Sequence, residues 1–175
     1  LIALCLSALG LSACSSTGSH SMYSQAELPA SVQVPAGHKV AMETVGVGLV
    51  TDECRAKRDM AAEHEWVFVG PNAKLQTRSG TVIGRYWRPP ATWENSDGSK
   101  VTATQLAVAP AGAGNIPVQL VKANPATGMG AMQGVTYIQR VATTGASRRA
   151  WPAGPRIWAA SKSCNIRPII FFGKR

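Results

Sequence analysis

Acidic residues and aromatic side chains are scarce in this sequence. Nine of the 175 residues are Asp or Glu against 18 Lys or Arg, and aromatic residues make up 6%. Hydrophobic residues reach 45% and charged residues only 15%, which excludes an intrinsically disordered chain. Four cysteines are too few for a disulfide-stapled miniprotein. A chain of this length can bury enough apolar surface to fold as one domain.

Motifs that dictate a particular chemistry are also missing. The sequence has no Gly-x-Ser-x-Gly elbow, no His-Glu-x-x-His and no phosphate-binding Walker loop. Three Gly-x-Gly pieces lack the third glycine of a dinucleotide site and are interpreted as bends; they are residues 46–48, 112–114 and 128–130. His64 has no second histidine at helical spacing, and His20 lies in a Ser-rich stretch. We therefore expect no metal and no cofactor.

The first fourteen residues carry a processing signal. Residues 1–11 are apolar but too short to span a bilayer, as in the h-region of a signal peptide. The following Leu11-Ser12-Ala13-Cys14 resembles the lipobox of bacterial lipoproteins, which makes Cys14 the predicted lipidation site. The alternative is an ordinary signal peptide with a chance cysteine. Because no methionine or basic n-region precedes Leu1, we expect several N-terminal residues to be missing.

The lipobox resemblance also implies a location and a membrane partner. Ser15 after the cysteine resembles the pattern of lipoproteins sorted to the outer membrane of a Gram-negative bacterium, on its periplasmic or surface face. Residues 1–13 would be removed as the signal peptide. Residues 14–27 are Ser-rich and without periodicity, which predicts a flexible tether between the lipid and the folded domain.

The remaining chain predicts an all-β domain. Short β-branched or alternating runs are separated by Gly-Pro, Ser-Gly, Pro-Pro, Asp-Gly and Asn-Pro breakers. The predicted strands are 38–50, 66–69, 81–87, 100–108, 116–121 and 135–141. This spacing favours an antiparallel β-sandwich or barrel. Residues 52–65 alone have helix-forming composition and are expected to form one short helix or a charged loop.

The segment 87–97 is the best candidate for a contact surface. Trp87, Trp93, Glu94 and Asp97 on a loop would suit a sugar or another small molecule. Paired with Glu43, the two carboxylates could instead serve a hydrolase. The structural alternatives are a turn at Asp97 and tryptophans that close the core. We expect Trp93, and likewise Trp66 and Tyr137, to lie in the core or to close it.

Six pieces of the sequence, in order, resemble a known family. They are VPAGHKV (34–40), GVGLVTDEC (46–54), EWVFVGPNAKL (65–75), TWENSDGSKV (92–101), NIPVQL (115–120) and YIQRVATTG (137–145). The run 28–145 is thereby similar to domain of unknown function 3455. The resemblance implies a secreted or envelope β domain and no particular activity. Asp52 and Arg85-Tyr86 stand where the family usually has an aromatic residue and a histidine, so no histidine-based site is expected there.

Residues 146–175 depart from this pattern. They carry seven basic and no acidic residues, a composition typical of an arm that binds nucleic acid or lipopolysaccharide. Because a lipoprotein has little access to nucleic acid, we expect no nucleic-acid partner. A third interpretation is that the reading frame of the gene is shifted in this region. Codons compatible with residues 164–174, read in the shifted frame, can encode a strand of alternating aromatic residues, which would be the closing strand. As printed, the tail lacks strand alternation, so we expect it to pack poorly.

The cysteines left after processing are Cys54 and Cys164. An oxidising periplasm would pair them in a disulfide, whereas a frameshifted tail would make Cys164 no true partner. The sequence as a whole predicts a non-catalytic envelope module that binds a small molecule, a glycan or a partner protein. The alternatives are a hydrolase of envelope or plant polymers acting through Glu94 and Asp97, and a purely structural stress or surface protein.

Overall fold

The computed structural model describes residues 23–87, 89–145 and 160–174. The predicted signal peptide, Cys14 and most of the predicted tether therefore lie outside the described residues, as does the tail segment 146–159. One 3-10 turn, η1 (Ala30–Val32), precedes nine strands. These are β1 (His38–Lys57), β2 (Met60–Gln76), β3 (Val82–Trp87), β4 (Thr92–Asn95), β5 (Lys100–Ala109), β6 (Val118–Ala123), β7 (Val135–Arg140), β8 (Thr144–Gly145) and β9 (Ala160–Lys174). None of the described helical residues forms a segment of the length and hydrophobicity that crossing a membrane requires.

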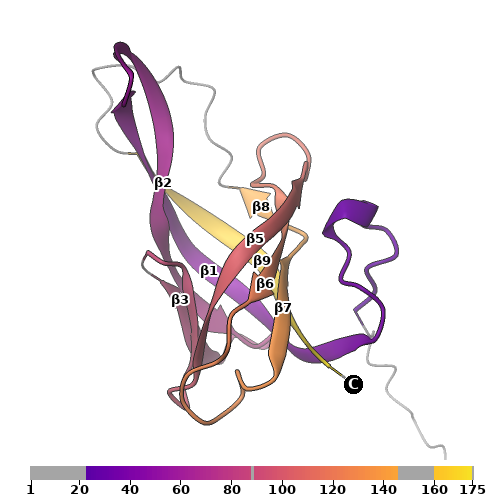
Figure 1. Cartoon of the computed structure of the whole chain (residues 1–175). Coiled ribbons are helices and arrows are strands. Elements are labelled where there is room, and N and C mark those ends of the chain that lie inside the picture. Colours follow the sequence, from indigo (N-terminus) through magenta and orange to yellow (C-terminus); the bar gives the residue numbers. More distant parts are fainter. Residues whose placement is uncertain (1–22, 88, 146–159, 175) are drawn as a thin grey trace, which may run out of the picture.

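The strands form one closed antiparallel barrel, which confirms the predicted all-β class. Strands β1 to β7 follow each other around the sheet, and β9 pairs with both β7 and β1 (Figure 1). Eight strands thus close the barrel, while the two-residue β8 pairs only with β9. Closure removes the unpaired edges that a sandwich would leave. The barrel alternative is therefore the correct one.

The expected helix or charged loop over 52–65 is wrong, because these residues form the end of a long hairpin. β1 continues to Lys57, which pairs with Met60 at the start of β2, and the register of the two strands shifts at Thr51/Asp52 and at Ala56/Lys57. The hairpin rises beyond the rest of the barrel in Figure 1. Helix-forming composition is overridden here by the ladder continuing from the barrel and by a cross-strand ion pair between Lys57 and Glu63.

For residues 169–173, the expectation that the tail packs poorly is also wrong. β9 is paired on both sides over 169–173, with β1 on one side and β7 on the other. Ile169 and Phe171 point into the barrel, while Ile170 and Phe172 belong to an apolar cluster outside it. A strand buried on both faces needs no alternation of apolar and polar residues. Whether the reading frame is shifted is a separate question, which the gene sequence decides.

Two apolar clusters hold the fold together. One lies in the interior of the barrel and includes Leu75, Trp93, Met132, Ile138 and Phe171. The other lies on the outer face of β6, β7 and β9, where the N-terminal segment with η1 covers it. Gln139, fully buried, fastens that segment by accepting from the Tyr23 hydroxyl and donating to the Val32 carbonyl.

The three aromatic residues expected in or over the core behave differently. Trp93 lies inside, with 5% of its surface exposed, as predicted. Tyr137 is half-buried and packs against the outer cluster, so it caps the core as predicted. Trp66 is half-buried on the hairpin, opposite Cys54, and belongs to neither cluster. The prediction for Trp66 is therefore wrong, because its strand extends past the barrel interior.

The register of β1 and β9 does not support the disulfide. The backbone of Cys164 lies opposite Gly48, six residues along β1 from Cys54. At about 3.3 Å per residue this is about 20 Å of strand, whereas the Cα atoms of a disulfide lie within about 7 Å of each other. Pairing Cys54 with Cys164 would require the strands to slide past each other.

Candidate functional site

The segment 87–97, expected to be one loop, contains the strand β4 and the corner that leads into it. Strand alternation divides three of the four candidate ligand contacts between the two faces of the barrel wall. Trp93 points inward with its neighbour Tyr86, while Glu94 and Trp87 point outward. Asp97 lies in the turn between β4 and β5. The structure therefore does not bring these four residues together into a single site.

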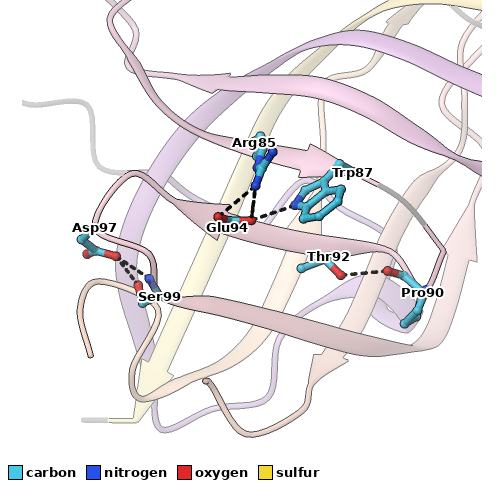
Figure 2. Close-up of polar contacts among 7 residues, drawn as sticks. All are labelled: Arg85, Trp87, Pro90, Thr92, Glu94, Asp97 and Ser99. Carbon is cyan, nitrogen blue, oxygen red and sulfur yellow. Dashed lines mark hydrogen bonds and ion pairs between the residues drawn. The ribbon is translucent and has the colours of Figure 1, made fainter. Parts of the chain in front are cut away.

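The outward side chains of Glu94 and Trp87 bond to each other and to Arg85. The Glu94 carboxylate accepts hydrogen bonds from Arg85 Nε and Nη2 at 3.1 and 3.2 Å, and from Trp87 Nε1 at 3.0 Å. The Arg85 guanidinium also lies 4.2 Å from the centroid of the Trp87 ring. Figure 2 shows Glu94 held between these two side chains. With its oxygens engaged in this way, Glu94 is placed as a structural group of the outer wall.

Asp97 joins two loops at the closed end of the barrel. Its carboxylate accepts from Ser99 N at 2.8 Å, Ser99 Oγ at 2.5 Å and Ala131 N at 2.7 Å. The Ser99 hydroxyl, and then the backbone donors, lower the pKa of Asp97 below its ordinary value. Gly130, at a positive φ of 145°, leaves room for this carboxylate, which any Cβ there would strike. The turn interpretation of Asp97 is the one that these contacts favour.

The third carboxylate of the hydrolase hypothesis has a different partner. Glu43 forms an ion pair with Arg78, which lies in the turn after β2. Among residues 23–87, 89–145 and 160–174, no group of three or more His, Cys, Asp or Glu side chains could hold a metal ion. Glu43, Glu94 and Asp97 thus each bind a different partner, namely Arg78, Arg85 and Ser99.

A cavity of about 670 Å³ opens at the other end of the barrel, which sequence reasoning missed. Residues of β1 to β7 and of the β5–β6 loop line it. Apolar residues make up most of this lining: Val50, Phe68, Tyr86, Ala91, Trp93, Ala103, Val108, Ile116, Pro117 and Val121. The polar ones are Asp52, Gln105, Asn115, Gln119 and Arg140. A mostly apolar cavity with a few polar groups is typical of small-molecule sites.

Tyr86 and Trp93 form the floor of this cavity. A much smaller space adjoins the cavity, and it is lined by the same two rings together with Gln119, Val121, Ile138, Arg140 and Ile169. Burial raises the pKa of the Tyr86 phenol, an effect that the nearby Arg140 guanidinium opposes. The phenol therefore stays uncharged at neutral pH. The indole Nε1 of Trp93 is buried without a hydrogen-bond partner among the described residues.

Phe68 and Val108 give the cavity an apolar rim. Each is 47% exposed, on β2 and β5 respectively. The sequence feature that could have predicted the lining of the cavity is the alternation of side chains along each strand. Once the register is known, this alternation places Tyr86, Trp93 and Val121 on the inner face. No sequence pattern reveals that the upper interior is left unfilled by side chains.

An antiparallel barrel of eight strands with a cavity at one end defines the class of protein, one whose interior has room for a single small molecule. The chain belongs to the family described as "Protein of unknown function (DUF3455)", whose sequence model matches residues 35–152. The match confirms the predicted family and extends seven residues beyond the expected limit at Gly145. No curated protein and no solved structure matches the chain.

Proposed function

We propose that this protein is a non-catalytic module that binds one small, largely apolar organic molecule inside its barrel. The observation that carries the proposal is the 670 Å³ cavity with its stacked aromatic floor. Volumes of roughly 300–1,000 Å³ are usual for such sites. The outer surface at Trp87, expected to stack a sugar, supports binding less well because Glu94 and Arg85 already engage the indole.

The proposal includes an anchor in the cell envelope. A lipid on Cys14 would hold the barrel at the outer membrane through the Ser-rich tether. Such a module would take up apolar compounds that dissolve poorly in the surrounding water. A hydrolase has no support in the contacts of Glu94, Asp97 and Glu43, each of which is engaged in a bond that stabilises the fold.

Binding can be tested with N-phenylnaphthylamine, an uncharged probe that fluoresces in apolar surroundings. The test compares two substitutions at adjacent positions of β5. Ala103→Trp fills the cavity, which Ala103 lines, whereas Thr104→Trp adds the same side chain at an exposed position of the same strand. We expect wild type and Thr104→Trp to bind the probe, and Ala103→Trp to lose it. Equal binding by all three proteins would refute the proposal.

A further inference from the structure

The polar side chains of the cavity are concentrated on one wall. Neighbouring strands β5, β6 and β7 supply Gln105, Gln119 and Arg140, and Gln119 is the direct cross-strand partner of Arg140. The facing strands β1, β2 and β4 supply the apolar Val50, Phe68 and Trp93, with Asp52 as the polar exception. Strands β5 and β6 also supply the apolar Ala103, Val108 and Val121, so a molecule in the cavity meets most of its hydrogen-bonding groups on one wall, set among apolar residues.

The two glutamines form a pair that still has capacity to bind. Gln119 Nε2 donates to Gln105 Oε1 at 2.6 Å, and neither amide has another hydrogen-bond partner among the described residues. Whichever way the two amides are turned, one NH₂ group and one carbonyl oxygen remain. The pair can thus donate one hydrogen bond to a ligand and accept another from it.

Charge in the cavity favours an uncharged ligand. The lining contains one acidic residue, Asp52, and one basic residue, Arg140, so their formal charges cancel. The Arg140 guanidinium donates to the Pro117 carbonyl at 3.0 and 3.3 Å, which ties it to the wall. An ion moved into this largely apolar space would lose its hydration without a surplus of opposite charge.

We propose that the ligand is an uncharged aromatic or alicyclic compound with a hydroxyl or amide group at its edge, and that the Gln105–Gln119 pair recognises this group. The proposal rests on the proposed function, since it names the chemistry of the molecule in the same cavity. A hydroxyl matches the pair because it both donates and accepts. The apolar body of the ligand would then lie against Val50, Phe68 and Trp93.

Three probes with one ring system separate the possible ligand chemistries. They are beta-naphthol with a hydroxyl, beta-methylnaphthalene without a polar group, and beta-naphthoate with a negative charge. With the full chain, calorimetry should show beta-naphthol binding about five- to tenfold more tightly than beta-methylnaphthalene, the effect of one or two neutral hydrogen bonds. Beta-naphthoate should bind more weakly than beta-naphthol.

A near-isosteric variant assigns the effect to the glutamine pair. Replacing both glutamines, in Gln105→Met/Gln119→Met, should lower the affinity for beta-naphthol to that for beta-methylnaphthalene and leave the latter unchanged. Gln133→Met, at an exposed position outside the cavity lining, is the matched control and should change neither affinity. Melting curves of both variants are the check that each is folded.

The outcomes distinguish the two proposals. If beta-methylnaphthalene binds but beta-naphthol binds no more tightly, or if Gln105→Met/Gln119→Met has no effect, the glutamine pair does not select the ligand while cavity binding stands. Tighter binding of beta-naphthoate than of beta-naphthol would show recognition of an anion and overturn the inference. If none of the three probes binds, the proposed function and this inference both fail.

Discussion

Tyr86 and Trp93 stack across adjacent strands, with ring centroids 4.4 Å apart and ring planes inclined by 15°. Direct cross-strand register between β3 and β4 places them opposite each other on the inner face. Below this pair the barrel is filled by apolar side chains, and above it lies the cavity. The stack therefore belongs both to the core that holds the barrel together and to the surface that a ligand would meet.

Truncating the inner tryptophan should destabilise the protein far more than truncating the outer one. Trp93→Ala removes a side chain from the packed interior and should lower the free energy of unfolding by about 3–5 kcal/mol. Trp87→Ala removes a half-buried indole from the outer wall and should cost less than half as much. Urea unfolding monitored by far-ultraviolet circular dichroism measures both. Equal losses of stability would contradict the burial of Trp93 inside the barrel and the position of Trp87 on its outer wall.

The contacts of Asp97 predict a specific loss of stability in acid. Because the folded-state pKa of Asp97 is lowered, its contribution is present above the unfolded-state value near 3.8 and disappears as pH falls through the folded-state pKa. Asp97→Asn should therefore be less stable than wild type at pH 6, and the gap should shrink as the pH falls below 3.8. Chemical denaturation at a series of pH values checks this. A gap that stays constant with pH would contradict it.

Neutralising Glu94 should weaken the wall without affecting the cavity. Its side chain is 18% exposed and forms an ion pair with Arg85 at 3.0 Å. Glu94→Gln should cost about 0.5–1 kcal/mol of stability at low salt, with a smaller loss in 1 M salt as the ion pair is screened. Because Glu94 points outward, N-phenylnaphthylamine should bind the variant as it binds wild type. A large loss of probe binding would show that the outer wall takes part in the site.

The sequence predicts the fold class because turn residues and short β-branched runs are local signals. It predicts less well where a tertiary partner decides the structure. Residues 52–65 have helical composition but extend the ladder that begins in the barrel. Ile170 and Phe172 break the expected alternation because the N-terminal segment covers the outer face of β9. The pairing of Tyr86 with Trp93, and hence the cavity floor, depends on the register of β3 and β4.

The predicted anchor can be tested independently of the barrel. If Cys14 is the lipidation site, a palmitate analogue fed to expressing bacteria should label the protein, and Cys14→Ser should abolish the label. Cys5→Ser is the matched control, since Cys5 lies in the predicted signal peptide and should not affect labelling. Labelling that survives Cys14→Ser would show that the lipid is elsewhere or that the lipobox resemblance is accidental.

The closing strand gives the sharpest test of the tail as printed. Phe171 packs inside the barrel and Phe172 in the outer cluster, where the ring of Tyr23 lies 6.2 Å from its own. If β9 closes the barrel in solution, Phe171→Ala and Phe172→Ala should each cost about 3–5 kcal/mol of stability. A tail produced by a shifted reading frame and packing poorly would make both substitutions nearly silent. Sequencing the gene is the complementary check, because a stop codon in the shifted frame within 146–175 would exclude the frameshift, whereas codons for an alternating aromatic strand would support it.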